Sequence, residues 1–354
     1  MIRIALIPGD GVGPEVLQEA QRVLSACVSA GLADIRTETF PHGADHYLAT
    51  GETLSDESFV RLRDEFDAIL LGAVGDSRVP DGRHARDILL GLRFRLDLYI
   101  NFRPARLRLP ELSPLRSADD RDIDFIIFRE NTEGLYTGAG RIESAGEPDE
   151  RAVSEAIATR HGVERIVRAA FEYARSEGRG RVTLGDKANA VPHVYGLWRR
   201  VFSEVAESYP EIEAEAQYVD ALAMQLVRAP DRFEVIVTSN LLGDILSDLA
   251  AELVGGMGLA PSANVNPGHH GLYEPVHGSA PDIAGTGTAN PVAAILSTAL
   301  LLRDGGASEA ADRVEAAVDA ALRDGLLTPD LGGACTTEEV GTWIADHVAK
   351  DGHR

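Results

Sequence analysis

The stretch IALIPGDGVGPEV (Ile4–Val16) constrains the fold of this chain more than any other. A short apolar run, typical of a buried strand, leads into a turn that holds Gly9, Gly11 and Gly13. A segment of helical periodicity follows from Pro14 to Ala30, and proline is tolerated in a first helical turn because its missing N–H has no partner there. Strand, tight turn and helix in this order predict an α/β fold.

The glycine turn does not match the dinucleotide-binding pattern. That pattern needs glycines at the first, third and sixth places, and counting from Gly9 the sixth place holds Pro14. No Gly-Lys-Ser/Thr sequence follows that would make the other common phosphate-binding loop. Asp10 would also put a negative charge where phosphates should lie. The turn alone therefore predicts a strand-to-helix connection, and an unrelated nucleotide-binding module has little support.

Further segments extend the α/β pattern. Asp67–Val74 is a predicted buried strand, and Asp122–Asn131 and Arg232–Asn240 are predicted strands that end in polar residues. These ends matter because the carboxyl ends of strands line the ligand crevice in open α/β sheets. The polar, glycine-rich segment Thr137–Glu150 is expected to be an exposed loop or hairpin. The glycine- and proline-rich stretch Gly256–Pro291 is expected to be a long loop, and long loops of this kind in compact domains are usually functional or disordered.

Composition limits the number of domains and the class of partner. A chain of 354 residues is longer than the roughly 250 residues at which cores split, so two domains are expected. The net charge of −22 disfavours nucleic-acid and anionic-membrane partners, which need a basic surface, but leaves room for a local arginine pocket that binds an anion. Two cysteines cannot form a disulfide framework, and the sequence shows neither a secretory signal nor a bilayer-spanning run. A cytoplasmic location is expected.

Asp244 and Asp248 are the first candidates for chemistry. They lie four residues apart in Asn240–Leu253, so on a helix they share one face at the edge of an apolar stripe. Acids near a helix start favour the macrodipole, which explains Asp244 but hardly Asp248, one turn further on. Two carboxylates on one face suit Mg²⁺ or Mn²⁺, which prefer oxygen ligands. Asp220 lies in the apolar run QYVDALAM and is expected to be buried, where a metal or a cation would have to compensate its charge.

Basic residues near the ends of apolar runs form a second candidate set. Arg103 and Arg129 lie where such runs finish, which favours a forked clamp on a carboxylate, whereas Arg95 is expected to be solvated. Tyr136 follows Arg129 by seven residues and is a candidate for the same cleft. Lys187 directly follows a predicted strand. A lysine near other cations loses its proton more readily and can act as a base near neutrality.

The motifs, taken together and in order, resemble the β-decarboxylating dehydrogenases, a family that includes 3-isopropylmalate, isocitrate, homoisocitrate and tartrate dehydrogenases. The motifs are IPGDGVGPE, LRFRLDLYINFRP, RENTEGLY, DKAN, YVDALAM, NLLGDILSDLA and EPVHGSAPDIAGTGTANP. The resemblance implies a two-domain α/β fold like that of isopropylmalate dehydrogenase, with a mixed sheet flanked by helices, and not a Rossmann fold. It implies a cofactor-binding domain at 1–99 and 255–354. It also implies a substrate and dimerisation domain at 100–254, with an arm near 137–155.

The resemblance implies a reaction in which a malate is oxidised by NAD and loses CO₂ with the help of a divalent metal. The residues that would bind the malate carboxylates are Arg93, Arg103 and Arg129. Asp244 and Asp248 would bind Mg²⁺ or Mn²⁺ together with Asp220 of the partner subunit, and the metal would lower the pKa of the substrate hydroxyl. Lys187 of the partner subunit would serve as the base, and Tyr136 would give a proton to the enol. Since each site uses two chains, the resemblance implies an active homodimer.

The resemblance places the adenosine half of the cofactor in the late glycine-rich loop. The expected cofactor contacts are Glu274, His277, Gly278, Ser279, Ala280, Asp282, Ile283 and Asn290. Asp282 can accept hydrogen bonds from ribose hydroxyls and would repel a 2′-phosphate. Family members that use the phosphorylated cofactor have Lys and Tyr at the places of Asp282 and Ile283, so NAD is expected and not NADP.

The substrate side chain at C3 is expected to contact Leu89 and Leu90. Both are apolar, as in the isopropylmalate enzymes, whereas isocitrate enzymes have Ser and Asn at these places. The first expected substrate is therefore 3-isopropylmalate, which would yield 2-oxoisocaproate in leucine biosynthesis. The smaller Ala190 in the segment after Lys187, and Arg86 at a place where many isopropylmalate enzymes have Glu, keep open a sibling dehydrogenase. Its substrate would be tartrate, D-malate, isocitrate, homoisocitrate or another 3-substituted malate.

A non-catalytic regulatory subunit is the remaining alternative from another class. Such subunits would be expected to lack a metal-binding aspartate or the catalytic lysine. All of these residues are present in this sequence, so the regulatory reading is disfavoured.

Overall fold

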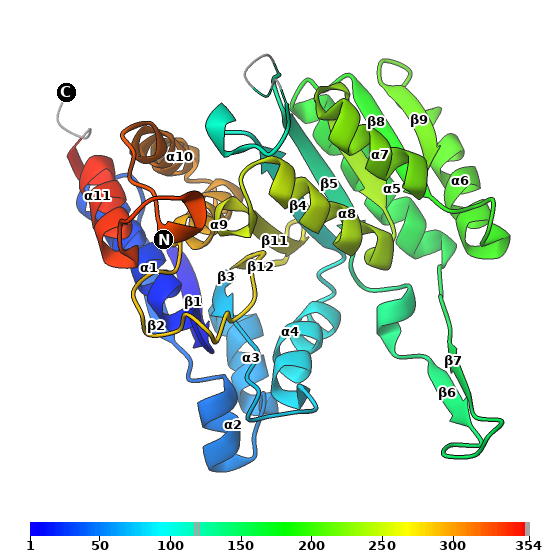
Figure 1. The fold of residues 1–354 in the computed structure, drawn as a ribbon, viewed down its shortest axis with the longest axis horizontal. Coiled ribbons are helices and arrows are strands. Elements are labelled where there is room, and N and C mark those ends of the chain that lie inside the picture. Colours follow the sequence, from blue (N-terminus) through cyan, green and yellow to red (C-terminus); the bar gives the residue numbers. More distant parts are fainter. Residues whose placement is uncertain (117, 119–120, 351–354) are drawn as a thin grey trace. The chain divides into compact units, whose positions relative to one another are not determined.

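The computed structural model describes residues 1–116, 118 and 121–350, and the chain divides into two compact units. Unit 1 comprises Met1–Leu98, Leu107–Asp120 and Ala251–Arg354, and unit 2 comprises Tyr99–Arg106 and Arg121–Ala250. Strands flanked by helices make up each unit (Figure 1), which confirms the expected α/β class with mixed β-structure. The assignment of cofactor binding to one domain and of dimerisation to the other stays a prediction.

Unit 1 contains strands in the spatial order β2-β1-β3-β12-β11. β1 pairs in parallel with β2 and β3, β3 pairs in parallel with β12, and β12 pairs antiparallel with β11. The strand bounds are β1 (Ile2–Gly9), β2 (Ile35–Thr39), β3 (Ala68–Ala73), β11 (Pro261–Asn266) and β12 (His270–Pro275). The helices are α1 (Gly13–Ser29), α2 (Ala44–Thr50), α3 (Asp56–Glu65), α4 (Arg83–Arg95), α9 (Val292–Asp304), α10 (Ser308–Arg323) and α11 (Thr337–Lys350).

The core of unit 1 follows from its apolar runs. All residues of β3 are buried, as expected for a strand between parallel neighbours that helices cover. α1 packs on β1 and β3, and α9 packs on β11 and β12 (Figure 1). The stretch Gly256–Pro291, expected to be a long loop, instead contains the β11–β12 hairpin, with its turn at 267–269. The part of the stretch that follows β12 does run without regular structure as far as α9.

Unit 2 contains strands in the spatial order β4-β5-β10-β8-β9, of which β4 and β5 pair antiparallel and the others in parallel. The strand bounds are β4 (Ile100–Arg106), β5 (Asp124–Glu130), β8 (Arg181–Asp186), β9 (Glu213–Tyr218) and β10 (Val235–Thr238). The helices are α5 (Arg160–Ser176), α6 (Pro192–Ala206), α7 (Val219–Arg228) and α8 (Asn240–Leu253), whose last residues belong to unit 1. Because β5, β8 and β10 are parallel, the residues at their carboxyl ends meet at one edge.

The hairpin of β6 (Gly140–Glu143) and β7 (Arg151–Ser154) projects from the rest of unit 2 (Figure 1). Its residues are largely exposed, and Ile142 has 63% of its surface exposed. β6 and the turn of the hairpin fall in Thr137–Glu150, the segment that the sequence predicted to be an exposed loop or hairpin, and β7 lies directly after it, within the arm expected near 137–155. Within the part of the chain that the structure describes, the helices are too short or too polar to cross a membrane.

The buried His42, in the segment before α2, predicts a loss of stability in acid. Burial, with a smaller contribution from the His46 imidazole, lowers the pKa of His42 to about 4. The unfolded chain, in which this pKa is about 6.5, therefore binds more protons below pH 6.5, so stability is unaffected above that value and falls as the pH drops toward 4. We expect His42 alone to lower the free energy of unfolding by about 2 kcal/mol between pH 7.5 and pH 5.

Urea unfolding of the His42→Phe variant at both pH values measures this effect. The variant should lose that part of the pH dependence, and His161→Gln, at an exposed position on α5, should keep it. An equal pH dependence in His42→Phe and in the unmodified protein would contradict the assignment to His42.

Candidate functional site

Arg129, near the carboxyl end of β5, is held by two side chains of α8. Its Nε and Nη2 donate to Oδ1 of Asn240 at 3.0 and 2.7 Å, and its Nη1 donates to Oδ1 of Asp244 at 2.5 Å. Arg129 is only 1% exposed, and a buried guanidinium needs such partners because removal from water is costly. Gly243 makes the close approach possible, since a Cβ there would lie 2.6 Å from Cγ of Arg129. The start of α8 and the end of β5 therefore fix the arginine in one position.

Tyr136 joins the same group. Its hydroxyl donates to Oδ2 of Asp244 at 2.7 Å, and the Arg129 guanidinium lies 5.4 Å from the centre of its ring. Asp244 thus accepts a hydrogen bond on each carboxylate oxygen. The structure brings together three of the predicted site residues, one from the end of a strand, one from a short 3-10 helix at 135–137 and one from α8.

Asp248 lies one turn beyond Asp244 on α8 and is half-buried. Burial raises the pKa of Asp248, the positive charge of Arg103 lowers it, and the negative charge of Asp244 raises it. Arg103 is itself buried on β4, where its Nε donates to Oδ1 of Asn101 at 2.8 Å. A divalent cation bound by Asp244 and Asp248 would offset the cost of burying the Asp248 charge. It would also offset the repulsion between the two carboxylates. The donor set of α8, two oxygen-bearing side chains on one face, therefore fits Mg²⁺ or Mn²⁺.

Asp220 and Lys187 form a separate pair. Asp220 lies in the first turn of α7, and the Nζ of Lys187, directly after β8, donates to its Oδ1 at 2.6 Å. This hydrogen bond lowers the pKa of Asp220. The expectation that Asp220 is buried was wrong: its side chain is 65% exposed, because α7 turns Leu222 and Leu226 into the core and leaves Asp220 on another face.

Within the described part of the chain, the structure does not bring a third His, Cys, Asp or Glu side chain to Asp244 and Asp248. Among residues 1–116, 118 and 121–350, no group of three or more His, Cys, Asp or Glu side chains is placed to hold a metal ion. Asp220 therefore does not lie beside Asp244 and Asp248 within one chain. Its predicted role as a ligand from the partner subunit stays a prediction, and the geometry of the single chain is consistent with it.

Arg93, the predicted substrate-binding arginine of unit 1, is buried near the end of α4. Its Nη2 donates to Oε1 of Glu274 on β12 at 2.9 Å, and Nδ2 of Asn264 on β11 donates to the same oxygen at 2.9 Å. Leu89 and Leu90 are half-buried on the same helix, and Leu89 packs against the core. Arg93 and Glu274, assigned to substrate and cofactor respectively, are thus direct neighbours.

The glycine turn after β1 contacts the late loop that was predicted to bind the cofactor. The backbone N–H of Val12 donates to the carbonyl of Ser279 at 2.8 Å, and a Cβ on Gly11, which has φ +57°, would lie 1.9 Å from that oxygen. Glu15 accepts hydrogen bonds from the backbone N–H groups of Gly285 and Gly287. Gly11 permits the close contact with Ser279, and Glu15 binds the backbone of Gly285 and Gly287. Together they hold the loop 279–287 against the glycine turn and the first turn of α1.

The predicted cofactor residues in that loop offer groups that fit an adenosine. Burial lowers the pKa of His277, and its Nε2 is buried with no hydrogen-bond partner among the described residues. Buried ring nitrogens are normally paired, and an adenine edge could supply the partner. Asp282 and Ile283 are exposed, one acidic and one apolar, and Asn290 is held by Asp330 at 3.1 Å. Gly278 and Ala280 lie beside these residues, and Ala280 has a left-handed backbone with φ 37°.

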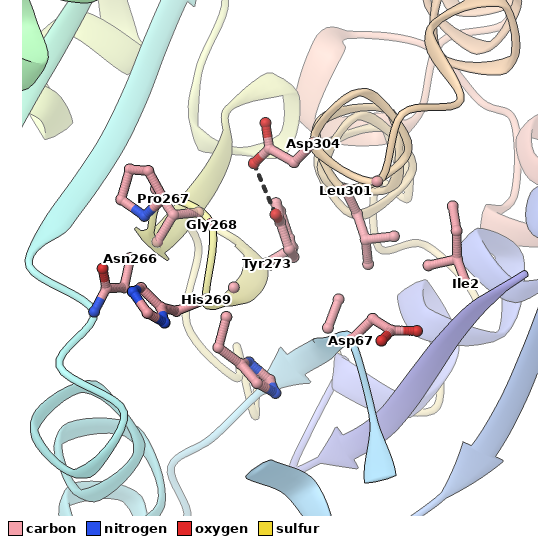
Figure 2. Close-up of a pocket in the computed structure, with 14 residues that line it drawn as sticks. Ile2, Asp67, Asn266, Pro267, Gly268, His269, Tyr273, Leu301 and Asp304 are labelled. Atoms are coloured by element: carbon pink, nitrogen blue, oxygen red, sulfur yellow. Dashed lines mark hydrogen bonds between the residues drawn. The ribbon is translucent and has the colours of Figure 1, made fainter. Parts of the chain in front are cut away.

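A cavity of about 340 Å³ elsewhere in unit 1 is not part of this constellation (Figure 2). It is lined at the beginnings of β1, β3 and β12 and at the end of α9, and the hydroxyl of Tyr273 donates to Oδ2 of Asp304 at 2.7 Å on its wall. Burial raises the pKa of Asp304. Since β1 and β3 begin here and end at the glycine turn, the cavity lies at the opposite ends of these strands.

Three asparagines were missed in the sequence, although each orients a predicted site residue: Asn101 for Arg103, Asn240 for Arg129, and Asn264 for Glu274. All three are buried. The available signal was an amide within or directly after an apolar run, where a polar side chain needs a partner.

The chain matches known proteins over nearly its whole length. The family model for isocitrate/isopropylmalate dehydrogenase matches residues 3–344. The 3-isopropylmalate dehydrogenase of Corynebacterium kroppenstedtii is 47% identical over 355 residues, covering 98% of this chain and 99% of that protein. The 3-isopropylmalate dehydrogenase of Mycobacterium tuberculosis is 47% identical over 337 residues, covering 94% and 98%.

Two solved structures share the fold. Isocitrate dehydrogenase from Methylococcus capsulatus has a TM-score of 0.90 and 40% identity, and the match covers 99% of this chain and 100% of that one. A β-decarboxylating dehydrogenase from Thermococcus kodakarensis, in its apo form, has a TM-score of 0.80 and 38% identity, covering 98% and 96%.

Proposed function

Because the chain belongs to the isocitrate/isopropylmalate dehydrogenase family, we propose that it catalyses the NAD- and metal-dependent oxidative decarboxylation of 3-isopropylmalate. The observation that carries the proposal is the group of Arg129, Tyr136 and Asp244, held by direct hydrogen bonds, with Asp248 one turn away. It combines a fixed cation, a proton donor and carboxylates in a member of a family of decarboxylating dehydrogenases.

A dicarboxylate substrate needs cations that do not move. Arg103 and Arg129 in unit 2 are buried and bound to asparagines, and Arg93 in unit 1 is bound to Glu274. Guanidinium groups fixed in this way would clamp the malate carboxylates with forked hydrogen bonds. Side chains fixed in this way would orient the bound malate for hydride transfer from C2 to NAD⁺.

Asp244 and Asp248, with Asp220 of the partner subunit, would hold Mg²⁺ or Mn²⁺, which when bound lowers the hydroxyl pKa and stabilises the enolate charge. Lys187 would accept the proton of the substrate hydroxyl in the partner's site as hydride leaves C2. Once CO₂ is lost, Tyr136 would deliver a proton to the enol carbon, since its hydroxyl lies beside Asp244, the proposed metal ligand.

A homodimer is part of the proposal. Large apolar side chains are exposed on α7 and α8, including Met224 at 66%, Val227 at 47% and Ile245 at 60%. Exposed apolar side chains grouped on the helices that carry Asp220 and Asp244 support a contact with a second copy. Such a contact would bring Lys187 and Asp220 to the site of the other chain. The proposed place of action is the cytoplasm.

The proposal is tested by kcat/KM over a substrate panel with NAD and Mn²⁺. An isopropyl group buried against Leu89 and Leu90 gains about 0.8 kcal/mol for each of its three carbons, or roughly 2.4 kcal/mol in total, so we expect about 60-fold preference for 3-isopropylmalate over D-malate. The likeness to an isocitrate dehydrogenase at 40% identity makes isocitrate the second candidate substrate. If isocitrate or tartrate is turned over severalfold better than 3-isopropylmalate, the assignment to Leu89 and Leu90 is wrong.

Cofactor choice is predicted from Asp282, which is exposed in the late loop. We expect faster turnover with NAD than with NADP, because this carboxylate would repel a 2′-phosphate. Asp282→Lys should narrow the ratio of kcat/KM between the two cofactors by about 10-fold, equivalent to ~1.4 kcal/mol. Asp312→Lys, a like change at an exposed position on α10, should leave the ratio unchanged. Equal use of both cofactors by the unmodified protein would contradict the role of Asp282.

A further inference from the structure

His84, in the first turn of α4, is buried against a carboxylate of the glycine turn. His84 has no exposed surface, and its Nε2 lies 2.8 Å from Oδ2 of Asp10. Because a carboxylate accepts, the imidazole Nε2–H donates. The His84 ring also stacks on Tyr47 of α2, with ring centres 6.3 Å apart and planes 16° from parallel.

The same carboxylate joins further segments of unit 1. Asp10 accepts a hydrogen bond from the backbone N–H of Ala44, at the start of α2, at 2.6 Å, and another from Gly75, after β3, at 2.7 Å. The residue is only 6% exposed. A buried carboxylate must keep its donors, since an unpaired one is costly to hold away from water. His84 is therefore tied to a point that three other segments fix.

The hydrogen bond between His84 and Asp10 fixes the position of α4, the helix that carries the predicted substrate contacts. Leu89 and Leu90 lie within two turns of His84, and Arg93 lies one turn beyond them. Other hydrogen bonds hold α4 further along: the buried bond from Arg93 to Glu274 holds its last turn, and the bond from Oγ1 of Thr53 to Asp87 at 3.2 Å is partly buried, so His84 is the buried contact that holds the first turn. A helix is stiff, so a change at its first turn moves the side chains along it.

We propose that His84 is a positioning residue that, through Asp10, sets the place of Leu89 and Leu90 and so selects a malate with an apolar side chain at C3. The inference rests on the proposed function. Asp10 also lies beside Gly11 and Val12, which pack on Ser279 of the late loop. The buried pair of His84 and Asp10 thus links α4, which carries the predicted substrate contacts, to the glycine turn, which contacts the predicted cofactor loop.

The test compares two variants by the ratio of kcat/KM for 3-isopropylmalate to kcat/KM for D-malate, which has no C3 side chain. His84→Leu fills the space but cannot donate to Asp10, and the ratio should fall at least 5-fold. His84→Gln carries an amide N–H that reaches the place of Nε2, and the ratio should return to within 2-fold of the unmodified protein. If His84→Leu does not fold, His84→Asn, whose amide is too short to reach Asp10, takes its place with the same expected loss.

Two outcomes overturn the proposal. An equal fall of both kcat/KM values, with the ratio unchanged, would mean that His84 serves stability alone, and failure of His84→Gln to restore the ratio would mean that the bond to Asp10 is not what matters. Failure of the proposed function is seen separately, in the unmodified protein, as preference for another 3-substituted malate. The ratio for that substrate over D-malate then tests His84 in the same way.

Discussion

Replacing Lys187 with methionine will lower kcat by about 1,000-fold while leaving the fold intact. Methionine keeps the length of the side chain but has no group that can take up a proton. The lost hydrogen bond to Asp220 lies at an exposed position, so stability should change little. Steady-state turnover and thermal unfolding of the same preparation measure the two effects.

Composition adds weight to this prediction. Of the 34 Lys and Arg side chains in the chain, only two are lysines, Lys187 and Lys350. Arginine cannot give up its proton in a protein, whereas lysine can, so a base is a role in which arginine cannot replace lysine. Lys350→Met, at the exposed end of α11, is the matched control and should turn over normally. Full activity of Lys187→Met would contradict the assignment of Lys187 as the base.

Replacing Asp248 with asparagine will abolish the stabilisation of the protein by Mn²⁺. At a concentration of 100 times Kd, the ion should add about 2.7 kcal/mol to the free energy of unfolding of the unmodified protein. The physical reason is that the Asp248 charge is unfavourable without a cation, because burial and the charge of Asp244 both raise the pKa of Asp248. A bound divalent cation offsets both effects, and the neutral asparagine cannot bind it in the same way. Turnover should fall at least about 100-fold as well, because the ion would no longer be held.

Thermal unfolding with and without Mn²⁺ separates this effect from catalysis. Without the ion, Asp248→Asn should be no less stable than the unmodified protein, since the change removes a repulsion. Glu252→Gln, an exposed acid on the same helix, should keep the full Mn²⁺ response. A rise in melting temperature of equal size in Asp248→Asn and in the unmodified protein would show that the ion binds elsewhere.

The fold and half of the site could be predicted because they depend on local patterns. Apolar runs gave β5 and β10, and the polar residues after them meet because parallel strands end at one edge. The contact between Arg129 and Asp244 follows from that rule. The spacing of Asp244 and Asp248 required only the helical period.

Other parts depend on contacts between distant segments, which the chain order does not reveal. Asp10 looked like an obstacle to phosphate, whereas in the structure it is an internal anchor whose partner, His84, lies 74 residues away. Asp220 was expected to be buried because its neighbours are apolar, but which face of α7 meets the core is decided by packing. The β11–β12 hairpin was missed because Asn, Pro and Gly at its turn dominate the composition of the stretch around it.

The central claim is that each site combines α8 of one chain with Lys187 and Asp220 of the other, and mixing two inactive variants tests it. In a hybrid dimer of Lys187→Met and Asp248→Asn, one site has both defects and the other has none. After subunit exchange of equal amounts, about half of the dimers are hybrids, so activity should recover to about one quarter of that of the unmodified protein. A mixture that stays as inactive as either variant alone would show that the site is built within one chain.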